Sequence, residues 1–61
     1  MNIEFFKKEI RRAYRVLGRY RAAAQVLNDI SGWKQDGYIT EAEADELHTY
    51  SRGCFMARKL R

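Results

Sequence analysis

The chain has 61 residues, one cysteine and a formal net charge of +4. A chain of this length forms one small domain, and small domains are usually stabilised by disulfides, metals or self-association. The single cysteine, Cys54, excludes an internal disulfide and leaves open a packed thiol or an intermolecular bond. The N-terminal residues are charged and no apolar run approaches about 20 residues, so we expect a soluble, cytoplasmic protein without a signal peptide or membrane span.

Charge is distributed along the chain in three blocks. Residues 1–21 have a net charge of +5, residues 22–51 a net charge of −5, and residues 52–61 a net charge of +4. In an antiparallel helical hairpin this order would place the two basic segments side by side at the open end. The acidic residues would then gather near the loop. We therefore expect a positive end and a negative end on the folded molecule.

Apolar residues in the first half recur at alternating steps of three and four, at Ile3, Phe6, Ile10, Ala13, Leu17, Tyr20, Ala24 and Leu27. This period is typical of an amphipathic helix with a narrow apolar stripe. It predicts one long helix over about residues 2–31. The pair Ser31-Gly32 is expected to end that helix, because glycine readily adopts the left-handed conformation found after helix C-termini.

The opposite side of this helix carries a basic ridge. Its members are Lys8, Arg11, Arg12, Arg15 and Arg19. Most of these cations have no acidic partner at helical spacing, so the ridge is either a solvated surface or a binding surface for an anionic partner. Two aromatic residues are further candidate contact residues. Phe5 falls on the basic side, and Tyr14 lies beside the apolar stripe.

The segment Asp36-Gly37-Tyr38-Ile39-Thr40-Glu41-Ala42-Glu43 resembles the second half of a calcium-binding EF-hand loop. The resemblance fails in the first half, because Gly32 and Lys34 stand at loop positions 1 and 3, where oxygen ligands are required. We therefore expect no calcium binding. Thr40 and Glu43 instead have the spacing of a helix capping box. This predicts a structural loop over about residues 32–39, whose Trp33, Tyr38 and Ile39 cover the end of the core.

A second helix is expected over about residues 40–59. One side of it should pack on the first helix through Ala44, Leu47, Tyr50, Ser51, Cys54, Phe55 and Ala57. A second apolar side is expected to form an oligomer interface through Ala42, Gly53, Met56 and Leu60. The sequence thus predicts an all-α fold in one domain, residues 1–61. That domain would be a helix–loop–helix antiparallel hairpin that dimerises into a four-helix bundle.

The sequence contains no recognisable catalytic motif. His48 and Cys54 are six residues apart on one helix and so lie on different sides of it, and the spacing of metal ligands or phosphate-binding glycines is absent. We expect no enzymatic activity, no cofactor and no metal. The favoured function is a small oligomeric interaction protein, an adaptor or inhibitor that binds an acidic surface of another protein. The alternative is nucleic-acid binding, in which the basic ridge contacts phosphates.

Membrane binding by the amphipathic N-terminal segment is a less favoured possibility, because its strict apolar period is more typical of a protein partner. Small helical chains of this kind are frequent among phage and mobile-element accessory proteins. No motif assigns the chain to that group.

Overall fold

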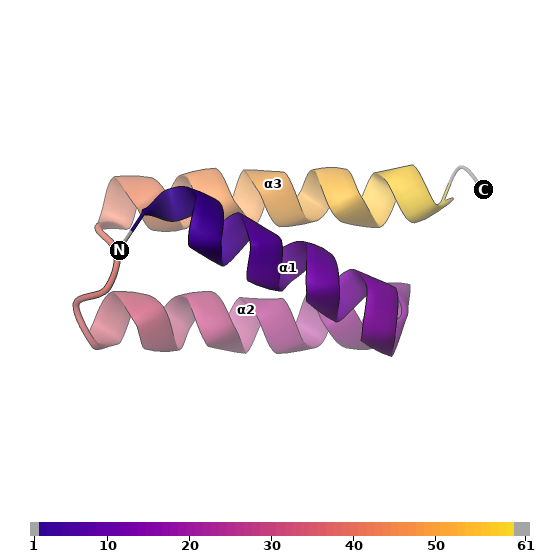
Figure 1. Ribbon diagram of the computed structural model, residues 1–61, viewed down its shortest axis with the longest axis horizontal. Helices are drawn as coiled ribbons and strands as arrows, with labels where there is room; N and C mark the ends of the chain where they lie inside the picture. Colours follow the sequence, from indigo (N-terminus) through magenta and orange to yellow (C-terminus); the bar gives the residue numbers. More distant parts are fainter. Residues whose placement is uncertain (1, 60–61) are drawn as a thin grey trace.

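The computed structural model describes the backbone of residues 2–59 and the side chains of residues 2–57. It contains three helices, α1 (Ile3–Leu17), α2 (Arg19–Gln35) and α3 (Glu41–Lys59), and no strand in this part of the chain. Figure 1 shows α2 and α3 lying antiparallel, with α1 crossing them obliquely. The prediction of an all-α fold is therefore confirmed. No helix within the described residues is long and apolar enough to cross a membrane.

The predicted long first helix is wrong, because the chain breaks at Gly18. This residue has φ 82° and ψ 167°, a backbone conformation that essentially only glycine adopts. It ends α1 at Leu17 and lets α2 start at Arg19 in a new direction. The first helical segment consequently folds back on the second. The chain forms a three-helix bundle and not a two-helix hairpin, and two copies would contain six helices and not four.

The loop between α2 and α3 is shorter than expected. Helix α2 continues through Gly32 and ends at Gln35. The Gly37 amide donates to the Lys34 carbonyl at 3.1 Å and the Tyr38 amide to the Trp33 carbonyl at 2.9 Å. These bonds, with Gly37 at φ 83°, form a Schellman motif one turn beyond the predicted helix end.

The predicted capping box at the start of α3 is confirmed. The Thr40 amide donates to Glu43 Oε1 at 2.8 Å, and the Glu43 amide donates to Thr40 Oγ1 at 3.1 Å. Ile39, just before the cap, is buried against the core, as is Ala44 one turn later. This arrangement of apolar residues around a helix start fixes the direction in which the chain enters the helix.

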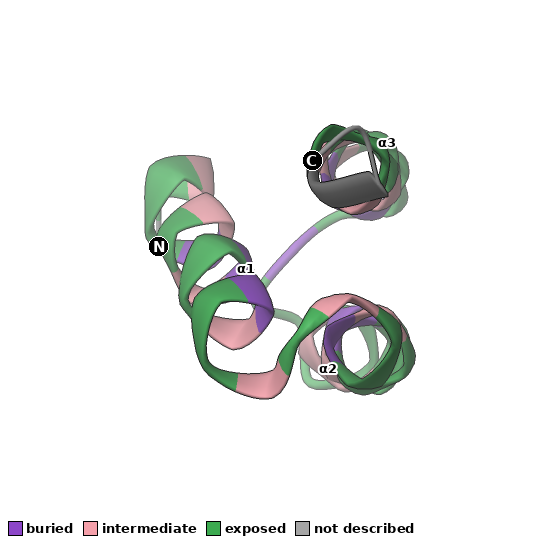
Figure 2. Ribbon diagram, turned by 90° about the vertical axis from the view of Figure 1, so that its right-hand side faces the viewer, coloured by how far each residue is buried: buried purple, intermediate pink, exposed green. Residues whose placement is uncertain are grey.

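The core lies between the three helices, where their buried sides face one another (Figure 2). Each helix contributes residues at steps of three or four. The buried residues are Phe6, Ile10 and Tyr14 from α1, Ala22, Val26 and Ile30 from α2, and Ala44, Leu47 and Ser51 from α3, with Ile39 from the loop. Fully burying one of the large apolar side chains contributes roughly 1.5–3 kcal/mol. The core side predicted for α3 is confirmed except at Ala57, which is exposed.

The break at Gly18 also changes which residues of the first half are buried. The predicted apolar stripe holds through Leu17, but Tyr20 and Leu27 are 71% and 59% exposed. In α2 the buried side is rotated to Ala22, Val26 and Ile30. Trp33 and Ile39 close the core at its end, with the Phe6 and Trp33 ring centroids 4.6 Å apart. Tyr38 does not take part, because it is 53% exposed.

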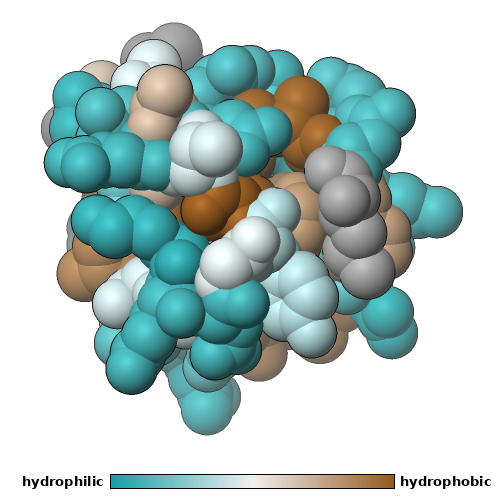
Figure 3. All heavy atoms as spheres, turned by 90° about the vertical axis from the view of Figure 1, so that its left-hand side faces the viewer, coloured by the Kyte–Doolittle hydropathy of each residue, from teal (hydrophilic) through white to brown (hydrophobic). Residues whose placement is uncertain are grey.

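The predicted negative end is less uniform than expected, because the N-terminal part of α1 adds basic residues to it. The N-terminus lies at the same end of the bundle as the α2–α3 loop (Figure 1). Lys7 of α1 therefore forms an ion pair with Glu46 of α3 at 3.0 Å. Seen from this end, the molecule is covered mostly by hydrophilic side chains, with a small hydrophobic area near the centre (Figure 3).

Candidate binding surface on the first helix

The predicted basic ridge divides into two groups in the folded chain. Lys8, Arg12 and Arg15 are exposed on α1, and within the described residues none of them forms a hydrogen bond or ion pair. Arg11 and Arg19 contact aromatic side chains of α3. The first group is available to a partner, whereas the second group contributes to helix packing.

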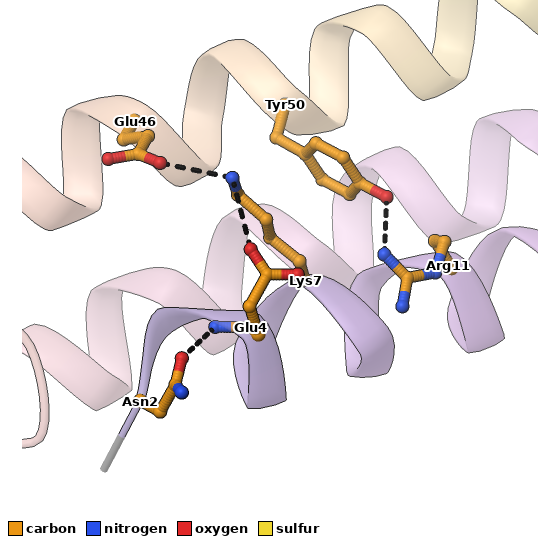
Figure 4. A network of polar contacts seen from close by, with 6 residues as sticks. All are labelled: Asn2, Glu4, Lys7, Arg11, Glu46 and Tyr50. Carbon is orange, nitrogen blue, oxygen red and sulfur yellow. Dashed lines mark hydrogen bonds and ion pairs between the residues drawn. The ribbon is translucent and has the colours of Figure 1, made fainter.

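Arg11 belongs to a polar network that holds α1 against α3 (Figure 4). Its Nη1 donates to Tyr50 Oη at 2.8 Å. Lys7 Nζ lies 3.0 Å from Glu46 and 3.6 Å from Glu4. The hydrogen bond with Glu46 raises the pKa of Lys7, and the hydrogen bond with Tyr50 raises the pKa of Arg11. Both contacts join a cation of α1 to a side chain of α3, so they help to fix how α1 lies on α3.

Arg19 lies at the start of α2 and is partly buried. Its Cζ is 4.0 Å from the centroid of the Phe55 ring and 4.8 Å from that of Tyr20. The two rings meet edge to face, with centroids 5.5 Å apart. A guanidinium over aromatic rings in this way contributes about 0.5–2 kcal/mol. Arg19 thus ties the start of α2 to the C-terminal half of α3, and it is not part of an exposed ridge.

Two apolar residues flank the free cations. Phe5 and Val16 are 48% and 67% exposed. Helical spacing places them on the same side of α1 as Lys8, Arg12 and Arg15, since Phe5 lies three residues before Lys8 and Val16 lies four residues after Arg12. We call this set the α1 outer face. It combines unpaired positive charge with exposed apolar area on one rigid helix.

A shallow groove runs between α1 and α2 beside this face. It has a volume of about 500 Å³ and is lined by Glu9, Arg12, Ala13, Val16, Leu17, Asp29 and Trp33. Arg12 and Val16 belong both to the groove and to the α1 outer face. Because Glu9 and Asp29 bring two carboxylates to the groove, its charge is mixed and the purely basic part lies on the outer side of α1.

Tyr14 does not belong to a binding surface. It is 1% exposed, and its Oη lies 3.0 Å from Ser51 Oγ inside the bundle. The sequence placed it beside the apolar stripe and suggested a contact with a partner. The buried side of α1 consists instead of residues at steps of four, which are Phe6, Ile10 and Tyr14. This candidate is therefore wrong, and the residue is part of the core.

The predicted oligomer interface on α3 is only weakly apolar. Ala42, Gly53 and Met56 are all exposed, but Met56, at 46%, is the one large apolar side chain among the three. Leu60, the fourth member, lies outside the described residues. The sequence does not predict that Val16 and Leu27 are exposed. Gly18 is the residue that indicates their exposure, because a helix end at this position changes which side chains of the following helix face solvent.

The residues of the EF-hand resemblance serve the caps of α2 and α3, as the bonds of Gly37, Thr40 and Glu43 show. Within the described residues, no group of three or more His, Cys, Asp or Glu side chains is placed to hold a metal ion. His48 and Cys54 are both partly buried on α3, and Cys54 is a free thiol.

Comparison of the chain with protein families, with curated proteins and with solved structures finds no match in any of the three.

Proposed function

We propose that this chain is a small, non-enzymatic interaction module that binds an acidic, partly apolar surface of another protein through the α1 outer face. The observation that carries the proposal is the combination of three cations, which have no ion pair or hydrogen bond among residues 2–57, with two exposed apolar side chains. A partner with negative charge would bind favourably to the exposed side chains of Lys8, Arg12 and Arg15. Phe5 and Val16 add apolar area, which is buried favourably against a protein but not against phosphates.

The packing of α1 suits this role. Phe6, Ile10 and Tyr14 anchor one side of the helix in the core, and the contacts of Lys7 and Arg11 fix it against α3. A rigid surface loses little conformational freedom on binding, so more of the contact free energy appears as affinity. The partly apolar groove beside Arg12 and Val16 gives space for side chains of the partner.

Nucleic-acid binding is the second candidate, and one observation favours it. Lys8, Arg12 and Arg15 form a row along α1, separated by about 6 Å and about 4.5 Å along the helix axis. Such a row can contact successive phosphates and would give binding that weakens steeply with salt. Two features next to the row are less suited to binding a polyanion. The first is the exposed apolar area of Phe5 and Val16, and the second is the negative charge of Glu9 and Asp29.

The proposal is tested by fluorescence anisotropy with labelled probes of each class. These are an amphipathic helical peptide of glutamate and leucine, the same peptide with every leucine replaced by alanine, and mixed-sequence DNA and RNA. We expect the glutamate–leucine peptide to bind at least tenfold more tightly than its alanine version. Arg12→Glu combined with Arg15→Glu should weaken that binding at least tenfold, because opposite charges at the interface become like charges.

The matched control reverses two exposed cations outside the α1 outer face, Arg21→Glu with Lys34→Glu. It should change peptide affinity by less than about threefold. A second variant, Phe5→Ser with Val16→Ser, should weaken peptide binding and leave any nucleic-acid binding unchanged. Strong, salt-sensitive binding to DNA or RNA without peptide binding would favour the second candidate. Absence of binding to all probes would contradict both.

The sequence also predicts self-association through Ala42, Gly53, Met56 and Leu60. A dimer remains part of the proposed function, but the exposed apolar area on this side of α3 is small. Larger exposed apolar side chains lie on α2.

A further inference from the structure

We infer that a second copy of this chain docks on an exposed stripe of α2, formed by Tyr20, Ala24, Leu27 and Ser31, to give an antiparallel dimer. This surface is separate from the α1 outer face. The inference does not rest on the partner proposed there.

The stripe is continuous and faces solvent. Its four residues are all exposed, with Tyr20 at 71% and Leu27 at 59%. They follow one another at steps of four, three and four, which is the spacing of residues that meet a partner helix. The Tyr20 ring touches Phe55 of α3, so the stripe lies on the α3 side of α2. Figure 2 shows α1 on the other side of the bundle, away from the surface that α2 and α3 share.

The order of side chains along the stripe fits a second copy running in the opposite direction. Large Tyr20 and Leu27 alternate with small Ala24 and Ser31. With the two-fold axis midway between Ala24 and Leu27, each large side chain faces a small one of the other copy. Tyr20 then packs over Ser31, and Leu27 over Ala24. Alternating large and small residues across facing positions allow helices to interdigitate.

Charge around the stripe is complementary in the same orientation. The end near the start of α2 carries Arg19, Arg21 and Arg52, and the end near the loop carries Asp36, Glu41 and Asp45, together with Lys34. An antiparallel arrangement sets the basic end of each copy beside the acidic end of the other. A parallel arrangement would bring like ends together, which costs free energy.

The size of the molecule allows such an interface. A standard interface buries about 800 Å² on each partner. The accessible surface of the molecule is 4511 Å², so an interface of that size would cover less than one fifth of it. On this side Tyr20 and Leu27 are 71% and 59% exposed, and Phe55 next to Tyr20 is partly buried.

Sedimentation velocity over roughly 5–500 μM at low salt tests the inference. We expect a reversible dimer whose dissociation constant rises at least tenfold in Leu27→Asp, because the carboxylate would be buried against Ala24. Val16→Asp is the matched control, since Val16 is a similarly exposed aliphatic residue on α1. It should leave the dissociation constant within about twofold of that of the unaltered protein. Circular dichroism verifies that each variant is folded.

A charge exchange tests the antiparallel register. Tyr20→Glu should weaken the dimer at least tenfold, and Ser31→Lys added to it should recover a substantial part of the loss. The two positions are about 16 Å apart along one helix, so they can pair only between copies. A monomer at 500 μM would overturn the inference. Equal weakening by Val16→Asp would also overturn it. The same holds for absence of recovery in the charge exchange, and for exclusive binding of a different partner to the stripe.

Discussion

Tyr14 is a polar residue at the centre of the bundle, with its hydroxyl group 3.0 Å from the hydroxyl group of Ser51. Both residues are buried, and together they join α1 to α3. A buried hydroxyl group that loses its partner costs about 1–3 kcal/mol, more than the roughly 1 kcal/mol that the bond itself contributes. The pair therefore specifies how the two helices are aligned and does not only add to stability.

This pair gives a prediction at the scale of single residues. Ser51→Ala should lower the free energy of unfolding by about 1–2 kcal/mol, because it removes a hydrogen-bond partner of the buried Tyr14 hydroxyl group. Adding Tyr14→Phe should cost less than the sum of the two single changes, since the residues interact directly. Urea unfolding followed by circular dichroism measures all three variants. Additive losses would show that the two hydroxyl groups do not stabilise each other.

The division of the five basic residues could not be predicted from spacing alone. In one uninterrupted helix all five would lie on the same side, and for this reason they are predicted to form one ridge. Arg19 belongs to α2, however, and stacks on Phe55, while Arg11 bonds Tyr50. Both partners come from a helix more than 30 residues away in the chain. Arg11 is exposed like Lys8, Arg12 and Arg15, but its guanidinium is engaged by Tyr50, and Arg19 is partly buried.

At the scale of elements, Gly18 determines the fold. Its positive φ lets α1 turn back over α2 and α3. A Cβ atom at this position would meet no atom within 4 Å, so the requirement for glycine comes from the backbone conformation and not from crowding.

Gly18→Ala is therefore expected to lower the free energy of unfolding of the three-helix monomer by about 1–3 kcal/mol. Alanine also favours helix at this position, so the variant should populate a form in which α1 and α2 are one helix. Urea unfolding and size-exclusion chromatography measure the two effects. Gly53→Ala is the control, because Gly53 lies inside α3 without a positive φ and alanine should stabilise the helix there. An unchanged or increased stability of Gly18→Ala would contradict the role given to Gly18.

Prediction from sequence succeeded where local signals decide the structure. Residues close in the chain determine the capping box at Thr40 and Glu43. They also determine the loop near Gly37 and the buried side of α3. It failed where tertiary contacts decide. The apolar steps of three and four run through Gly18 without interruption, so the period alone suggested one helix and assigned Tyr20 and Leu27 to the core. A glycine between Leu17 and Arg19 was the local signal against this.

At the scale of the whole molecule, the two proposed surfaces lie on different sides of the bundle. The α1 outer face carries Lys8, Arg12 and Arg15 with exposed apolar neighbours, and the stripe of α2 carries Tyr20 and Leu27. Docking of a second copy on α2 would leave the α1 outer face of each copy free. Two copies would then present two binding surfaces, which raises the apparent affinity for a partner that carries two acidic sites.

The α1 outer face is the proposed binding surface of this protein. The most direct test of this proposal is a titration of ¹⁵N-labelled protein with the glutamate–leucine peptide, followed by two-dimensional NMR. We expect the amide signals of residues 5–16 on α1 to shift most, with smaller shifts at groove residues such as Asp29. The signals of α3 residues 41–57 should change little. Dominant shifts on α3 or along the stripe of α2, with α1 unaffected, would contradict the proposal.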